Sequence, residues 1–218
     1  MIKYKKILAI ETSNELCSVA LLLDKNIYDE RNIQIKHVHS ERLIPVIDEL
    51  LRSNKTSAKE LWAIAVSIGP GSFTGLRIGL TAAKGIAFAA EIPIIPVPTF
   101  SALALEISEY FIKATNFIIA NNANIEECYL AKFKFENGSL IELQIPELIS
   151  KKDVDKFIDN GNLVFGNLKN VKNIKNISAP RASSVAKWTY LFGEDLLTFD
   201  YDYLEPNYLK DFKVKKAK

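Results

Sequence analysis

The segment Ala63-Ile64-Ala65-Val66-Ser67-Ile68, followed at once by Gly69-Pro70-Gly71-Ser72-Phe73-Thr74-Gly75, decides the fold. Six largely apolar residues bounded by a glycine loop predict a short buried strand. The residues after the loop predict a long helix to about Ala90, and Ile94 to Val97 then predicts another buried strand. Strands that alternate with a helix in this way indicate an α/β protein with parallel strand pairs.

The residues before this unit add three strands and a helix. Alternating or continuous apolar residues predict strands at 5–10, 16–23 and 27–35. From Ser40 to Ser53 the apolar period becomes helical, and Ser57 with Glu60 forms a capping-box pattern for a short helix at 58–61. Thr99 is expected to cap a further helix that ends near Ile112.

The second half restarts with strands. We expect them at 117–120, 128–135 and 140–145, the last two joined by the hairpin signal Asn137-Gly138. A short helix near 154–158, a strand at 163–165 and a helix at 184–192 complete a less regular unit. The sequence therefore predicts two lobes, each with a mixed sheet flanked by helices: residues 1–104, and residues 105–218 with a basic tail.

Composition excludes several classes of protein. The chain has 218 residues, and its 28 Lys and Arg against 26 Asp and Glu give a net charge of +2. This charge is too balanced for a protein that binds nucleic acid without a partner. Cys17 and Cys128 are the only cysteines, which favours reduced thiols over a disulfide framework. No apolar run approaches the ~18 residues of a membrane span, so we expect a cytoplasmic protein without membrane contact.

The glycine loop has two interpretations. Gly71, Gly75 and Gly79 recur every four residues and lie on one helix face, which suits either an anion nest at the helix N-terminus or close helix packing. The loop lacks the spacings of a P-loop, a Rossmann fingerprint and a nucleophile elbow.

The carboxylate and hydroxyls of Glu11-Thr12-Ser13 follow the first strand. With Gly71 and Ser72 they are candidates to face a nucleotide or phosphate, although acids and hydroxyls are also ordinary turn residues. No metal site is expected, because His37 and His39 are the only histidines. The tail lysines, Lys210 to Lys218, suit either a solvated tail or contact with RNA phosphates.

Three motifs resemble one family. They are Ile7-Leu8-Ala9-Ile10-Glu11-Thr12-Ser13, His39-Ser40-Glu41-Arg42-Leu43-Ile44-Pro45 and, above all, 69–79, Gly-Pro-Gly-Ser-Phe-Thr-Gly-Leu-Arg-Ile-Gly. They are similar to the TsaB (YeaZ) proteins of bacterial tRNA threonylcarbamoyladenosine synthesis, which have the actin-like/sugar-kinase/Hsp70 fold. Asn122 and Asn124 stand where the family usually has Asp and Arg, and 206–210 resembles its Pro-x-Tyr-x-Arg with Lys in place of Arg.

The resemblance implies a non-catalytic subunit with no catalytic residue, metal or cofactor of its own. It implies binding to the catalytic paralogue TsaD and the ATPase TsaE, which would use ATP and Mg²⁺, with tRNA reached only through the complex and a homodimer in isolation. The implied interface lies on the helices 40–53 and 75–90. Its expected members are Leu43, Ile47, Leu50, Gly75, Leu76, Gly79, Ala83 and Ile86.

Two alternatives stay open. Glu11-Thr12-Ser13 and the glycine loop also suit an ATP-dependent kinase of the same fold. A module in which bound nucleotide only stabilises a complex is the other alternative.

Overall fold

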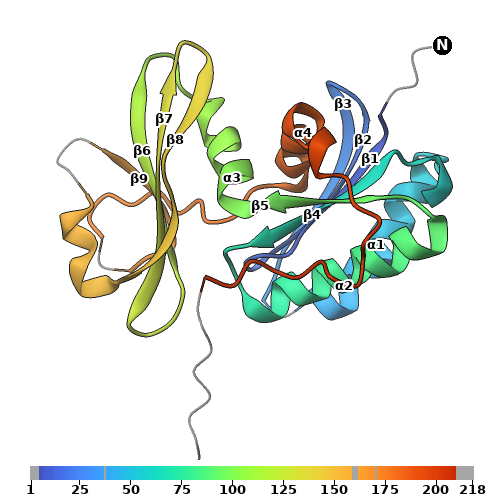
Figure 1. Cartoon of the computed structure of the whole chain (residues 1–218), viewed down its shortest axis with the longest axis horizontal. Helices are drawn as coiled ribbons and strands as arrows, with labels where there is room; N and C mark the ends of the chain where they lie inside the picture. The colour runs from blue at the N-terminus through green and yellow to red at the C-terminus, as the bar shows by residue number, and fades with distance from the viewer. Residues whose placement is uncertain (1–4, 37, 159–161, 170, 210–218) are drawn as a thin grey trace, which may run out of the picture.

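The computed structural model describes residues 5–36, 38–158, 162–169 and 171–209, which form two sheets side by side (Figure 1). The first is mixed, with strand order β3-β2-β1-β4-β5. Its antiparallel strands are β1 (Ile7–Glu11), β2 (Leu16–Asp24) and β3 (Ile27–Gln34), and β4 (Ala63–Gly69) and β5 (Ile94–Pro98) run parallel to β1. The parallel unit predicted around the glycine loop is therefore confirmed.

Helices cover both faces of this sheet because alternate residues of the buried strands point to opposite sides. Leu8 and Ile10 pack under α1 (His39–Ser53) and α2 (Phe73–Ala90), whereas Ile7 and Ala9 face α4 (Ala182–Phe192). Figure 1 shows α1 and α2 together on one face and α4 on the other. None of the helices in the described ranges has both the length and the apolar composition needed to cross a membrane.

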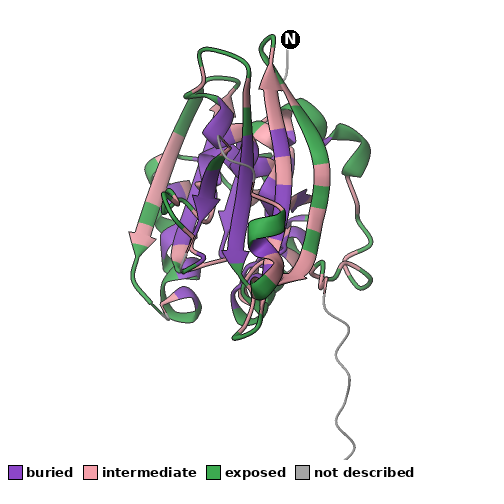
Figure 2. Ribbon diagram, turned by 90° about the vertical axis from the view of Figure 1, so that its left-hand side faces the viewer, coloured by how far each residue is buried: buried purple, intermediate pink, exposed green. Residues whose placement is uncertain are grey.

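The second sheet has strand order β8-β7-β6-β9. Its strands are β6 (Thr115–Asn122), β7 (Glu127–Glu136), β8 (Ser139–Ser150) and β9 (Leu163–Gly166). Exposed and half-buried residues run along the edge strand β8, whereas β6 and β9 are mostly buried (Figure 2). The hairpin predicted at Asn137-Gly138 is confirmed, with positive φ angles of 53° and 76° at the two residues. Helix α3 (Thr99–Ser108) packs on one face through Phe100 and Leu103, and η2 (Lys151–Lys156) covers the other with Val154.

The expectation that residues 105–218 all belong to the second lobe needs correction. Helix α4 packs on the first sheet through Val185 and Ala186, and Thr198, beyond η3 (Glu194–Leu196), pairs with Ile94 of β5. The chain therefore builds its second sheet and then returns to the first lobe. The physical reason is that one face of the first sheet would otherwise expose apolar side chains such as Ile7.

Of two local expectations about helix ends, one is confirmed and the other is wrong. The capping box at η1 (Ala58–Glu60) is confirmed, with the Ser57 main-chain N–H donating to Glu60 Oε2 at 2.7 Å. Thr99, however, lies inside α3 rather than capping it, and its buried hydroxyl accepts a hydrogen bond from Gly69 N at 2.9 Å. Helix α3 also ends at Ser108, earlier than expected.

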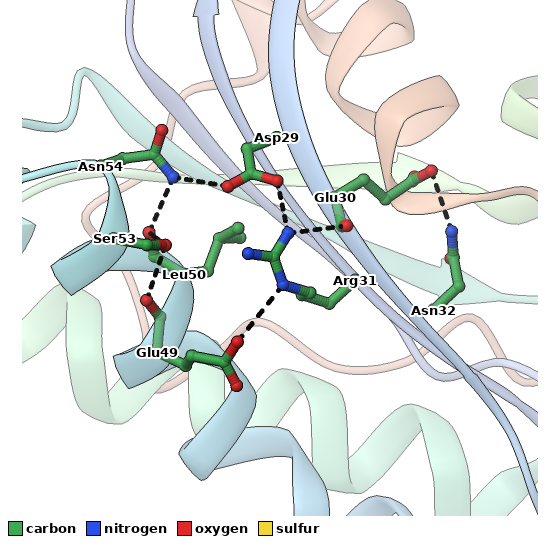
Figure 3. Close-up of polar contacts among 8 residues, drawn as sticks. All are labelled: Asp29, Glu30, Arg31, Asn32, Glu49, Leu50, Ser53 and Asn54. Atoms are coloured by element: carbon green, nitrogen blue, oxygen red, sulfur yellow. Dashed lines mark hydrogen bonds and ion pairs between the residues drawn. The ribbon is translucent and has the colours of Figure 1, made fainter.

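A polar network fixes α1 against β3 (Figure 3). Arg31 pairs with Asp29 and, from its Nε at 3.4 Å, with Glu49 Oε1 of α1. Asn54 donates to Asp29 Oδ2 at 2.8 Å and to Leu50 O at 2.9 Å. The bond from Asn54, assisted by Arg31, holds the pKa of Asp29 below its usual range. These contacts add a polar link between β3 and the C-terminal half of α1, beside the apolar packing of Ile47 and Leu50.

Candidate functional site

Glu11, at the end of β1, is bound inside the protein. Its side chain is fully buried, accepting from Ser13 N through Oε1 and from the Ser67 hydroxyl through Oε2. Burial raises the pKa of Glu11 to about 7, against the opposing effect of the hydrogen bonds from Ser13 and Ser67. The Glu11 carboxyl, a candidate from the sequence to face a phosphate, therefore joins the ends of β1 and β4.

Thr12 is the contact point for the glycine face of α2. Its hydroxyl donates to Gly75 O at 2.8 Å, and a Cβ at Gly75 would lie 2.1 Å from the Thr12 main-chain oxygen. A Cβ at Gly79 would lie 2.3 Å from Thr12 Oγ1. The glycines therefore allow α2 to pack on its own sheet, which selects the packing interpretation for these two positions.

Most of the residues predicted for a partner interface also pack within the chain instead. Leu43, Ile47, Leu50, Gly75, Leu76, Gly79 and Ala83 are all buried within the chain, and Ile86 is half-buried. The apolar spacing located the helices correctly but identified the faces that pack on the sheet. The outer faces instead carry Ile44, which is 52% exposed, and Phe88, which is 73% exposed.

A cleft of about 680 Å³ lies between the lobes. The first lobe contributes residues 13–15 and the loop 71–74 at the N-terminus of α2, and the second contributes 121–124, Tyr129 and Asn167. Of the predicted phosphate-facing residues, Ser13, Gly71 and Ser72 line this cleft, whereas Glu11 and Thr12 lie beneath it. Ser72 N donates to Ser13 O at 2.7 Å, and a Cβ at Gly71 would lie 2.5 Å from that same oxygen.

The C-terminal segment closes one side of the cleft. Tyr208 lines it and accepts a hydrogen bond from Arg77 Nε at 2.8 Å, while its ring lies 5.1 Å from that of Phe73. The Arg77 guanidinium lies 3.8 Å above the Phe73 ring. Asn207 N donates to Ile68 O at 2.7 Å. The tail lysines from Lys210 onward, like His37, lie outside the described residues.

Several amide side chains line this cleft. Asn14 Nδ2 donates to Ser178 Oγ at 2.8 Å, and Asn121 Nδ2 donates to Ser178 O at 2.7 Å. Asn122 Oδ1 accepts from Lys151 Nζ at 2.5 Å. Asn14 and Asn167 were not singled out by the sequence pattern. Their one signal is position: Asn14 lies in the bend between β1 and β2, and Asn167 directly follows β9.

The described residues contain no group of three or more His, Cys, Asp or Glu side chains placed to hold a metal ion. His39 belongs to α1, and its Nε2 lies 3.2 Å from Leu16 O. Its burial and this bond make it part of the junction between α1 and β2.

Comparison with known proteins agrees with this geometry. Residues 33–189 match the family model "TsaD: tRNA N6-adenosine threonylcarbamoyltransferase". The tRNA threonylcarbamoyladenosine biosynthesis protein TsaB of Haemophilus influenzae is 37% identical over 126 residues, 58% of this chain and 52% of that protein. Its namesake in Buchnera aphidicola subsp. Acyrthosiphon pisum is 33% identical over 155 residues, 71% and 69% of the two chains. The match therefore spans about half the length of the Haemophilus relative.

Among solved structures, YeaZ from Pseudomonas aeruginosa superposes with a TM-score of 0.76 and 25% identity, covering 94% of this chain and 100% of that one. Two mixed sheets flanked by helices, with a cleft between them, define a two-lobed protein of the actin-like/sugar-kinase fold. Within that class, the chain belongs to the TsaB (YeaZ) family.

Proposed function

We propose that this chain is a non-catalytic subunit in the synthesis of tRNA threonylcarbamoyladenosine, and that it binds a TsaD paralogue in a complex that includes TsaE. ATP and Mg²⁺ would be used by those partners, and tRNA would be reached only through the complex. The family relationship supports the pathway, since the curated relatives carry its name.

The burial and hydrogen bonding of Glu11 support the proposal that the chain is non-catalytic. Its carboxyl is fully buried and engaged by Ser13 and Ser67, so it does not reach the cleft. The cleft itself has Glu15 as its one charged lining residue among the described positions, and that carboxylate pairs with Lys36 at 3.1 Å. Phosphoryl transfer depends on charged groups that position Mg²⁺ and phosphate, and this lining supplies amides instead.

The outer faces of α1 and α2 support the partner-binding part. The two helices lie together on one face of the first sheet (Figure 1), and their outward residues include Ile44, Gly85 and Phe88. At Gly85 no atom from beyond the adjoining residues and the neighbouring helix backbone lies within 4 Å of where a Cβ would be, and the residue is exposed. A small residue on an exposed helix lets a partner helix approach closely. Without the paralogue, we propose that the same surface pairs two copies of this chain.

Co-elution with the TsaD paralogue of the source organism tests this surface. Gly85→Arg places a long charged side chain on the open face without disturbing the core, and we expect it to weaken the complex at least tenfold. Gly85→Ala is the matched control and should bind as the wild type does. A complex that forms equally well with Gly85→Arg would remove α2 from the interface, and no complex with wild type, with or without TsaE and ATP, would overturn the proposal.

Leaving this chain out of a reconstituted tRNA modification assay tests its proposed role in the pathway. We expect threonylcarbamoyladenosine formation by the paralogue, TsaE and ATP to fall when this chain is left out. The isolated chain should turn over ATP no faster than its Glu11→Ala variant. Turnover that Glu11→Ala abolishes, in a variant that urea unfolding shows to be folded, would establish the kinase alternative in its place.

A further inference from the structure

Residues 167–176 contain a three-residue repeat that the proposed function does not use. They read Asn-Leu-Lys-Asn-Val-Lys-Asn-Ile-Lys-Asn, so an apolar residue and a lysine each recur at every third position. Leu168, Val171 and Ile174 all pack in the apolar cluster between the second sheet and η2. The apolar members of the repeat therefore fix this segment to the second lobe.

Backbone hydrogen bonds hold the two ends of the segment together beside β9. Gly166 N donates to Lys175 O at 2.9 Å, and Lys175 N donates to Val164 O at 2.8 Å. Between these ends, Leu168 is only 3% exposed. A segment anchored at its ends and along its apolar side loses less conformational entropy when its outward side chains bind a partner.

The lysines of the repeat form a strip of unneutralised charge. Lys169, Lys172 and Lys175 are all exposed, and none has an ion pair or a side-chain hydrogen bond with a residue that the structure describes. No Asp or Glu occurs between residues 161 and 193, and the two other cations of that stretch already pair with glutamates. Helix η2, on the same face, adds three lysines against two aspartates. Positive charge is therefore concentrated here, on a chain whose net charge is only +2.

The make-up of the strip suits a phosphate backbone better than a protein surface. No apolar residue of the repeat is exposed, and the exposed residues that accompany the lysines include Asn173 and Asn176. The cores of protein–protein interfaces are depleted of lysine and enriched in aromatic side chains. Contacts to the phosphates and sugars of nucleic acids, in contrast, come from lysines and amide side chains.

We propose that Lys169, Lys172 and Lys175 form a contact strip for the phosphate backbone of tRNA. This contact rests on the proposed function, which brings tRNA to the complex, and it names a place where this chain touches that tRNA. Three charges are too few to hold an RNA by themselves, so the strip acts within the complex. It lies on the second lobe, whereas the proposed partner surface lies on α1 and α2 over the first sheet (Figure 1).

Binding of an unmodified tRNA transcript to the complex of this chain with the TsaD paralogue tests the strip. The test variant combines Lys169→Gln, Lys172→Gln and Lys175→Gln, which remove three charges from exposed side chains. Arginine at the same three positions keeps the charge and serves as the rescue variant. The matched control removes three charges from lysines elsewhere that are exposed and have no ion pair within the described residues: Lys25→Gln, Lys59→Gln and Lys113→Gln.

We expect the test variant to bind tRNA at least tenfold more weakly than the wild type at about 50 mM salt. The logarithm of the association constant falls with the logarithm of salt concentration by about 0.7–0.9 for each phosphate contact, so the slope should become shallower by about 2–3. The rescue variant and the matched control should keep the affinity and the salt dependence of the wild type.

Three outcomes would overturn this contact and leave the proposed function in place. They are a test variant that binds tRNA as the wild type does, equal weakening by the test variant and the matched control, and loss of the complex itself by the test variant, which would assign the strip to a protein partner. Failure of the wild-type chain to form the complex, or of that complex to bind tRNA, would overturn the proposed function and this contact with it.

Discussion

Substitution of Gly79 by alanine tests whether the glycine face of α2 serves the protein's own core. A Cβ at this position would lie 2.3 Å from Thr12 Oγ1 and 3.5 Å from both Thr12 Cβ and Ile10 Cγ2. The first distance is a severe overlap and the others are ordinary contacts. The destabilisation caused by Gly79→Ala therefore depends on one atom, the Thr12 hydroxyl oxygen.

Two opposing effects set the magnitude. Replacing glycine by alanine inside a helix stabilises it by about 1 kcal/mol, whereas overpacking a close-packed site costs about 1–3 kcal/mol. Gly79→Ala should therefore lower the free energy of unfolding by up to about 2 kcal/mol. Gly85→Ala, with open space around the new methyl group, should raise it by about 1 kcal/mol.

Thr12→Ala should relieve the overlap at position 79. By itself this substitution removes the hydrogen bond to Gly75 O and should cost about 0.5–1.5 kcal/mol. In its background Gly79→Ala should become stabilising, giving a coupling of about 1–3 kcal/mol. Gly75→Ala is not rescued in this way, because its new methyl group would meet the main-chain oxygen of residue 12, at 2.1 Å.

Urea unfolding followed by circular dichroism measures these differences as shifts of the midpoint at constant m value. Gly79→Ala as stabilising as Gly85→Ala would refute the packing argument. So would an equal rescue of Gly75→Ala and Gly79→Ala by Thr12→Ala, because only one of the two overlaps involves the threonine side chain.

Three further predictions concern other groups. Burial raises the Glu11 pKa from 4.5 to about 7, so between these pH values the folded state holds a proton that the unfolded state has lost. The contribution of Glu11 to stability therefore falls as pH rises through this window, by on the order of 3 kcal/mol. Glu11→Gln should flatten this pH dependence, as measured by urea unfolding at several pH values. Arg77→Ala should loosen the C-terminal segment and speed hydrogen exchange of the Asn207 amide about threefold, and unchanged exchange would show that Arg77 does not hold it. Cys17 and Cys128 are buried with thiol pKa values raised to about 11, chiefly by burial, so an aromatic disulfide reagent at pH 8 should label them only on unfolding; rapid labelling of the native chain would contradict this.

The local pattern of the sequence determined most of the elements. The buried strand at 63–69, the glycine loop and the long helix after it follow from apolar periodicity and glycine placement, as does the Asn137-Gly138 hairpin. These signals lie within a few residues of one another. They were therefore available without knowledge of any distant contact.

Only the tertiary structure decided which face each helix buries and where the chain returns to the first lobe. Periodicity places Leu43 on one side of α1, and Gly75 and Gly79 on one side of α2, but it does not say whether those sides meet the protein's own sheet or a partner. In the same way, the attachment of α4 to the first lobe depends on strands more than 150 residues earlier, and Ser178 joins Asn14 to Asn121 across 164 and 57 residues. Sequence alone thus located the glycine loop, whereas the burial of Glu11 depends on which distant groups folding brings beside it.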